Sequence, residues 1–221
     1  MKVGALTIGQ SPRVDIIPEI QSVLGASIEI VERGVLDGLE LEAVKKMSPR
    51  TDDDTLVTRM RDGTEVKVAK AHLMERMRHC ISEFQTEPVE MIMLLCTGEF
   101  PAVSSKKILV RPDRIIRHVV QALLNEGRLG LVVPSPEQIP QLKKKWEKIA
   151  HQVVAKSVSP YTGTDEEMTD VAKKLASEDV DLVVLDCMGF DTKTRSLFKA
   201  ITQKPVLLPR TVMARIVLEM I

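Results

Sequence analysis

This chain of 221 residues has few aromatic side chains, few cysteines and a formal net charge of zero. It has one Trp, one Tyr and four Phe, too few for the stacking platforms on which proteins bind single-stranded nucleic acid. The 31 basic residues balance 31 acidic ones, so no overall field attracts nucleic acid or an anionic membrane surface. Neither is therefore expected as a partner.

Long apolar runs are absent too, so no membrane span is expected. The opening MKVGALTIG is too short for a signal peptide, which favours a cytoplasmic location. Three cysteines without a secretory signal argue against a disulfide framework. Without C-x-x-C or H-x-x-x-H spacing, no metal site is expected either. We therefore predict free thiols.

Short runs rich in Val, Ile and Leu alternate with longer segments of helical period, which is typical of α/β folds with mainly parallel sheets. Strands are expected in KVGALTI, SIEIVERG and VEMIMLLC, and again in RLGLVVP, HQVVAKSV and VDLVVLDC. Each series runs strand, helix, strand, helix, strand, and then a cysteine. This order suggests a duplicated α/β unit.

We predict two Rossmann-like (flavodoxin-like) halves related by a pseudo-twofold axis. The first half covers 1–110 and is completed by the C-terminal segment 206–221, and the second covers 111–205. The Asp62-Gly63 pair is a strong signal for a two-residue turn, and it predicts a β-hairpin insertion near 55–69 in the first half.

Several residues are expected to begin or end helices. Thr164 and Glu167 have the spacing of a capping box. The other predicted starts are Ser11-Pro12, Asp113 and Ser135-Pro136, and the predicted ends are Gly25 and Gly127.

Two cysteines, Cys96 and Cys187, directly follow buried strands, and a glycine comes two residues after each. Ligands of open parallel sheets bind outside the carboxyl ends of the strands, so both thiols are expected at a ligand-binding edge. If the halves face each other, one thiolate can remove a proton from a carbon next to a carboxylate, and the opposing thiol can deliver one to the other face. Packing is the alternative interpretation, and it is the one we give to Cys80, which lies within a helix.

Loop residues near the two cysteines are candidate contacts for an anionic ligand. Ser11, Ser135 and Thr211 are equally well explained as helix caps. The candidates are Gln10, Ser11, Arg13, Thr97, Gly98, Glu99, Pro134, Ser135, Met188, Gly189, Arg210 and Thr211.

Other polar features indicate no further site. The four histidines, His72, His79, His118 and His151, lie in predicted helices or at a strand start, which leaves a Ser/His/Asp triad and a metal centre without support. The TDDD segment at 51–54 is interpreted as a solvated loop, and KKKW around Trp146 as a solvated helix face.

The segments LTIGQSPRVDIIPEI, LLCTGEF, VVPSPEQ and LDCMGF together resemble the AroM family of bacterial proteins over essentially the whole chain. More distantly, the paired cysteines and duplicated halves are similar to the aspartate/glutamate/hydantoin racemase superfamily, which includes arylmalonate decarboxylases and maleate isomerases. That resemblance implies that Cys96 and Cys187 act as opposing acid/base or nucleophilic groups without a cofactor.

The cysteine motifs depart from those of the racemases. Racemases typically carry Cys-Asn-Thr or Cys-Thr-Thr in the first half and Gly-Cys-Thr-His in the second. Here the motifs read Cys-Thr-Gly and Asp-Cys-Met-Gly, so the histidine is missing and a carboxylate without an amino group fits better. Asp186 would raise the pKa of the Cys187 thiol if both side chains pointed the same way.

Two hypotheses follow. The first is a cofactor-independent isomerase, racemase or decarboxylase that acts on a small carboxylic acid in a cleft between the halves, through Cys96 and Cys187. The second is a noncatalytic metabolite-binding or regulatory protein on the same scaffold, linked to aromatic amino-acid metabolism. A homo-oligomer is compatible with both.

Overall fold

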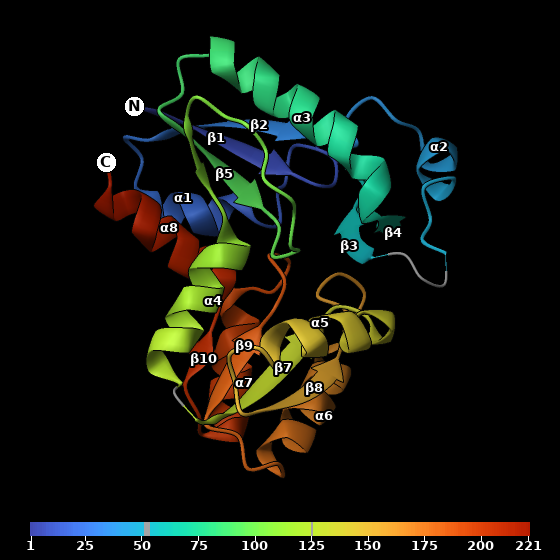
Figure 1. Ribbon diagram of the computed structural model, residues 1–221, viewed down its shortest axis with the longest axis vertical. Helices are drawn as coiled ribbons and strands as arrows, with labels where there is room; N and C mark the ends of the chain where they lie inside the picture. Colours follow the sequence, from blue (N-terminus) through green and yellow to red (C-terminus); the bar gives the residue numbers. More distant parts are fainter. Residues whose placement is uncertain (51–53, 125) are drawn as a thin grey trace. The chain divides into compact units, whose positions relative to one another are not determined.

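The chain divides into two compact units (Figure 1). The computed structural model describes residues 1–50, 54–124 and 126–221. Unit 1 comprises Met1–Asp113 and Met213–Ile221, and unit 2 comprises Arg114–Val212. The chain passes from one unit to the other within helix α4 (Pro112–Leu123) and returns within helix α8 (Pro209–Glu219).

Unit 1 is built on a parallel sheet in the order β2-β1-β5-β6. Its strands are β1 (Lys2–Thr7), β2 (Glu29–Gly34), β5 (Met91–Leu95) and β6 (Ile108–Val110). Its helices include α1 (Ile17–Leu24), α2 (Leu41–Lys45) and α3 (Lys70–Thr86). Helix α3 runs along this sheet (Figure 1), and Phe84 lies so close to Gly4 of β1 that a larger residue would displace the ring.

Unit 2 has a second parallel sheet, in the order β10-β9-β7-β8. Its strands are β7 (Arg128–Val133), β8 (Gln152–Ser157), β9 (Leu182–Leu185) and β10 (Val206–Leu207). A 3₁₀ turn, η1 (Pro136–Gln138), precedes α5 (Ile139–Trp146), and α6 (Asp165–Ala176) and α7 (Thr192–Thr202) follow. One apolar cluster joins the sheet to α6 and α7, and another joins it to α4 and α5.

The two sheets have the same strand order when β1, β2, β5 and β6 are matched with β7, β8, β9 and β10. The predicted α/β fold with two mainly parallel, Rossmann-like halves is thereby confirmed. The sequence did not predict β6, because only three residues lie between two lysines and the Arg-Pro pair that follows.

The predicted β-hairpin is present, as β3 (Thr55–Arg59) paired with β4 (Glu65–Ala69). The prediction of a two-residue turn is wrong. The N–H of Met60 donates to the carbonyl of Thr64 at 2.8 Å, so the turn has three residues and Gly63 takes a φ of 98°. The hairpin packs at the carboxyl end of the sheet, where β3 leaves no room for a side chain at Gly9 or Gly98.

One predicted helix start is wrong and another is confirmed in part. Ser11 does not begin a helix, because α1 starts at Ile17. Ser135 and Pro136 do begin a helical segment, but it is the 3₁₀ turn η1, and α5 starts only at Ile139. The Ser135 hydroxyl donates to Glu137 and makes no cap hydrogen bond.

Helix α4 also differs from its predicted bounds. It starts at Pro112, so Asp113 lies inside its first turn and does not cap it. It ends at Leu123, well before Gly127.

The other predicted helix signals are confirmed. Thr164 and Glu167 form the capping box of α6, with hydrogen bonds of 3.2 and 2.8 Å. Gly25 ends α1 with a φ of 85°.

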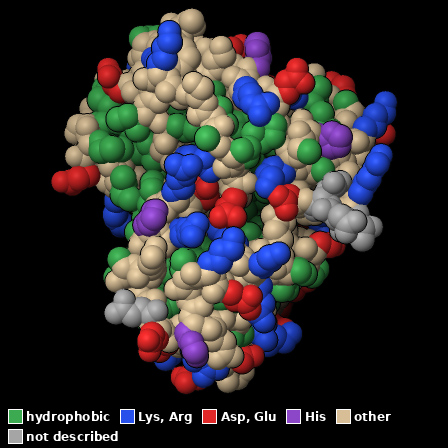
Figure 2. Space-filling view, in the orientation of Figure 1, with side chains coloured by type: hydrophobic (Ala, Val, Ile, Leu, Met, Phe, Trp, Pro, Cys, Tyr) green, Lys and Arg blue, Asp and Glu red, His purple; other side chains and the backbone are tan. Residues whose placement is uncertain are grey.

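Basic and acidic side chains are interspersed across the face shown in Figure 2, as the balanced composition leads one to expect. Among the described residues, no helix is both long and apolar enough to cross a membrane. Three residues of the TDDD segment, 51–53, lie outside the described residues.

Candidate active-site loops at the two strand-end cysteines

Cys96 lies at the carboxyl end of β5, one of the two central strands of its sheet. Thr7 of β1 pairs with Leu95 of β5, so the loops that follow both strands leave the sheet at the same edge. The N–H of Gly98 donates to Cys96 Sγ at 3.3 Å. Cys96 is 7% exposed and borders the apolar cluster of unit 1.

Cys187 follows β9, the matching strand of unit 2. The N–H of Asp186 donates to the carbonyl of Val132 at 2.8 Å, which extends the pairing of β9 with β7 as far as the cysteine. The N–H of Gly189 donates to Cys187 Sγ at 3.3 Å, and the Tyr161 hydroxyl lies 3.9 Å from the same sulfur. Cys187 is 8% exposed.

The two Cys-x-Gly loops, Cys96–Gly98 and Cys187–Gly189, therefore have the same internal geometry. In each, the glycine N–H donates to the sulfur two residues earlier at the same distance. A donor of this kind stabilises a thiolate more than a neutral thiol. The repeated Cys-x-Gly pattern thus places the same backbone donor on each sulfur.

A buried arginine holds the backbone after each cysteine. Arg210, which is fully buried, donates through Nε and Nη2 to the carbonyl of Met188 at 2.9 and 2.7 Å, and through Nη2 to the carbonyl of Gly189 at 2.8 Å. Arg111 donates to the carbonyl of Phe100 at 2.7 Å and pairs with Asp113. Arg210, predicted as an anion contact, therefore donates to main-chain carbonyls.

Gln10 and Ser11, in the loop after β1, bind protein groups in this structure. The Gln10 amide donates to the carbonyls of Leu36 and Leu39 at 3.2 and 2.8 Å. The Ser11 hydroxyl donates to Asp37 at 2.6 Å. These side chains join the loop after β1 to the loop after β2.

Arg13 is 2% exposed and is also held inside unit 1. It donates to Thr7 Oγ1 at 2.7 Å and to both carboxylate oxygens of Asp15, at 2.9 and 2.7 Å. Burial alone would raise the pKa of Asp15, but the hydrogen bonds and charge of Arg13, with Arg59, outweigh it and lower that pKa below its ordinary value.

The remaining candidates lie at the same two sheet edges. Thr97 is buried and Glu99 exposed beside Cys96, while Pro134, Ser135 and Met188 are buried in unit 2. The Thr211 hydroxyl donates to the carbonyl of Leu208 at 3.1 Å. In each unit the predicted residues therefore follow the carboxyl ends of strands of the sheet whose edge also carries the cysteine.

Asp186, the neighbour of Cys187, binds helix α5. Its Oδ2 accepts a hydrogen bond from Trp146 Nε1 at 2.7 Å and lies 3.6 Å from Lys145 Nζ. Lys145 and Trp146 are 5% and 1% exposed. The interpretation of KKKW as a solvated face is therefore wrong for these two residues, although Lys143 and Lys144 are exposed. The Lys145 ammonium offsets the Asp186 charge beside the thiol.

Comparison with known proteins identifies the family. Residues 3–221 match the family model described as AroM protein. The chain belongs to the AroM family. None of the curated proteins matches this family member.

Solved structures similar to this AroM family member share its fold. Allantoin racemase from Klebsiella pneumoniae is 12% identical with a TM-score of 0.66, over 100% of this chain and 86% of that one. Maleate isomerase Iso from Pseudomonas putida S16 is 13% identical with a TM-score of 0.61, over 100% and 93%. Glutamate racemase from Aquifex pyrophilus is 12% identical with a TM-score of 0.59, over 100% and 84%. These likenesses establish the two-domain racemase fold.

Cys80 of this AroM family member differs from the other two cysteines. It lies in the middle of α3, where burial raises the pKa of its thiol. Its Sγ is 3.9 Å from the carbonyl of Gly34. It therefore remains a neutral thiol near neutral pH, in agreement with its interpretation as a packing residue.

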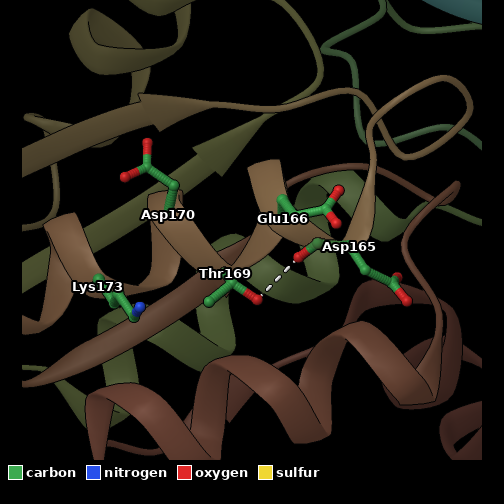
Figure 3. Close-up of a pocket in the computed structure, with 5 residues that line it drawn as sticks. All are labelled: Asp165, Glu166, Thr169, Asp170 and Lys173. Atoms are coloured by element: carbon green, nitrogen blue, oxygen red, sulfur yellow. Dashed lines mark hydrogen bonds between the residues drawn. The ribbon is translucent and has the colours of Figure 1, made fainter.

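A surface cavity of about 340 Å³ lies along α6 (Figure 3). Thr169 donates to the carbonyl of Asp165 at 2.8 Å, and Lys193 pairs with the Asp165 carboxylate. The lining residues come from successive turns of one helix: Asp165, Glu166, Thr169, Asp170 and Lys173. These are the solvated side chains of an acidic helix start.

Sequence reasoning missed Arg111, Tyr161 and Lys145. Arg111 had a signal, because an arginine beside a proline follows the last strand of each series, as VRP in the first half and LPR in the second. Tyr161 and Lys145 reach the Cys187 region from loops and helices distant in the chain, so no local pattern indicates them.

Proposed function

We propose that this AroM family member is a cofactor-independent isomerase, racemase or decarboxylase that acts on a small carboxylic acid, with Cys96 and Cys187 as its acid/base pair. The observation that carries the proposal is the matched construction of the two Cys-x-Gly loops, with a glycine N–H on each sulfur at 3.3 Å. A cysteine that only filled space would not need a donor aimed at its sulfur, and still less the same donor in both units.

The chemistry assigns one proton transfer to each sulfur. One cysteine, as a thiolate, removes the proton from the carbon next to the carboxylate and becomes a thiol. The electron pair left on that carbon is delocalised into the carboxylate, and the second cysteine, as a thiol, returns a proton and becomes a thiolate. In the decarboxylation variant the carbon loses carbon dioxide instead of a proton, and a thiol then protonates it.

The substrate carboxylate is proposed to bind main-chain N–H groups of the two loops, at Thr97, Glu99 and Met188. Gln10 and Ser11 support this edge through their bonds to neighbouring loops. Met188 and Gly189 bring no side-chain donor or acceptor for an amino group to the second loop. A carboxylic acid without an amino group is therefore the proposed substrate class.

Proton exchange tests the proposal. The protein is incubated in heavy water with a panel of small 2-substituted carboxylic acids, and deuterium at the carbon next to the carboxylate is measured by NMR together with stereoinversion. Cys96→Ser and Cys187→Ser should each nearly abolish inversion, because serine is a far weaker acid and base than cysteine near neutral pH. One of these variants should retain exchange on a single face.

Cys80→Ser is the matched control, and its exchange rate should equal that of the parent. A variant that lacks both Cys96 and Cys187 but exchanges as fast as the parent would overturn the cysteine mechanism. Absence of exchange across a broad panel would favour the second candidate.

The second candidate is a noncatalytic metabolite-binding protein on the same scaffold. The low exposure of the two cysteine residues, 7% for Cys96 and 8% for Cys187, favours it, because structural cysteines are typically this buried. Under this hypothesis a carboxylate raises the melting temperature without exchange, and Cys96→Ser and Cys187→Ser leave that shift unchanged.

A further inference from the structure

We propose that Arg210 is a positioning residue for Cys187, which it holds ready for reaction through the single peptide group between Met188 and Gly189. This inference rests on the proposed function in taking Cys187 as an acid/base group. The property that it concerns is the reactivity of the Cys187 thiol, which can be measured without a substrate.

The geometry is that of a relay across one peptide plane. The carbonyl of Met188 accepts two hydrogen bonds from Arg210, at 2.9 and 2.7 Å. The N–H at the other end of the same peptide group, on Gly189, donates to Cys187 Sγ at 3.3 Å. Because a peptide group is planar, fixing the direction of its C=O also fixes the direction of its N–H.

Charge is transmitted along the same path. The guanidinium polarises the peptide group, and a polarised N–H is a stronger donor to a negative sulfur. Burial opposes this, because it disfavours a thiolate. Cys187 lies among apolar side chains such as Phe190 and Phe198, so the relay has to outweigh the loss of solvation.

Three other polar side chains near Cys187 in the chain or in space are those of Asp186, Tyr161 and Asp191. The carboxylate of Asp186 is held by Trp146 and Lys145 on α5. The Tyr161 hydroxyl, from the loop after β8, is 3.9 Å from the sulfur. The carboxylate of Asp191, at the start of α7, accepts hydrogen bonds from the backbone and hydroxyl of Thr194.

Lysine cannot replace arginine here. Nε and Nη2 of Arg210 bind two successive carbonyls, those of Met188 and Gly189, in one fixed fork. A lysine ammonium is a single point on a flexible stem and cannot hold both carbonyls in that arrangement.

Unit 1 provides an internal comparison. Arg111 binds the carbonyls of Phe100 and Pro101, beyond the peptide group that donates to Cys96. Its effect on Cys96 is therefore indirect, and the relay is specific to Cys187.

The test is the rate of alkylation by iodoacetamide as a function of pH, with each cysteine followed by peptide mass mapping in the full-length protein. Because the thiolate is the reactive form, the midpoint of the profile reports its formation. In Arg210→Lys and Arg210→Gln we expect the Cys187 midpoint to rise by about one pH unit, which is roughly a tenfold slower reaction below the midpoint. The profiles of Cys96 and Cys80 should not change.

Arg111→Lys is the matched control and should leave the Cys187 profile unchanged. An unchanged Cys187 profile in a folded Arg210 variant, or an equal shift of all three cysteines, would overturn the proposal. If both variants fail to fold, the parent protein provides the test. A Cys187 midpoint in the folded parent that is no lower than the Cys187 midpoint in the urea-unfolded parent would overturn the proposal.

Activity measurements test the proposed function separately. If no substrate exchanges protons but the Cys187 profile responds as expected, the relay stands and the acid/base role falls. If exchange occurs and the profile is unaffected by Arg210, the acid/base role stands and the relay falls.

Discussion

At Gly98 and Gly189, neighbouring residues lie so close to the backbone that a side chain would meet them. Neither glycine has a positive φ, so backbone conformation is not the reason for glycine at these positions. A Cβ on Gly189 would lie 2.7 Å from Pro160 Cγ and from the ring of Tyr161. A Cβ on Gly98 would lie 2.7 Å from Leu56 Cδ2. The missing side chain lets a neighbouring segment cover each loop while its N–H stays on the sulfur.

Asp15 makes the stability of unit 1 depend on pH. Its pKa is lowered in the folded protein, mainly by the hydrogen bonds and charge of Arg13 acting against burial. Its contribution is therefore full above the unfolded pKa of 3.8 and is lost as pH falls through the lower, folded value. Asp15→Asn should destabilise the protein by about 1–3 kcal/mol near pH 7, because it also leaves Arg13 without its carboxylate.

Urea unfolding of the parent and Asp15→Asn at a series of pH values measures this effect. The difference between the two should shrink as the pH falls below about 4, where the parent carboxylate is protonated as well. A difference that stays constant down to the lowest accessible pH would contradict the assignment.

Lys145 of helix α5 forms a buried ion pair with Asp186, the residue before Cys187. Lys145→Met should destabilise unit 2 by about 3–5 kcal/mol, because it leaves the Asp186 carboxylate buried without its cation. Asp186→Asn in the same chain should recover part of that loss, which a double-mutant cycle in urea measures.

Lys144→Met, at the exposed neighbouring position, is the control and should change stability by no more than about 0.5 kcal/mol. Strictly additive effects of Lys145→Met and Asp186→Asn would show that the pair does not couple.

The elements that sequence predicts well are those with local causes. Central strands such as β5 and β9 are continuous apolar runs, and the Thr164 capping box needs only residues within one turn. The Ser11-Pro12 pair failed as a helix start because the Ser11 hydroxyl bonds to Asp37, a carboxylate distant in the chain that a cap prediction does not consider. The Ser135-Pro136 pair starts a 3₁₀ turn, and α5 follows it only from Ile139.

Some residues of the candidate site could likewise be predicted from local sequence, and others could not. Cys96 and Cys187 could be placed at sheet edges, because both follow apolar strands. Arg210, however, reaches Met188 over 22 positions of the chain, and Lys145 reaches Asp186 over 41. These partners are set by packing between elements, which residue spacing does not encode.

Each of the two units has its own sheet and apolar clusters, yet α4 and α8 both extend across the boundary between units. Unfolding of either unit would therefore fray the ends of α4 and α8 that belong to the other unit. We expect cooperative unfolding: denaturation followed by Trp fluorescence and by far-ultraviolet circular dichroism should give coincident curves. Two curves with separate midpoints would show that the units unfold independently.

The placement of Trp146 has a spectroscopic consequence. Trp146 and Tyr161 are the chain's sole Trp and Tyr, and both belong to unit 2. One binds the carboxylate next to Cys187 and the other lies 3.9 Å from its sulfur. Intrinsic Trp and Tyr fluorescence therefore reports on the Cys187 loop without a label. Unit 1 has phenylalanine but neither Trp nor Tyr, so an introduced fluorophore is needed to report on Cys96.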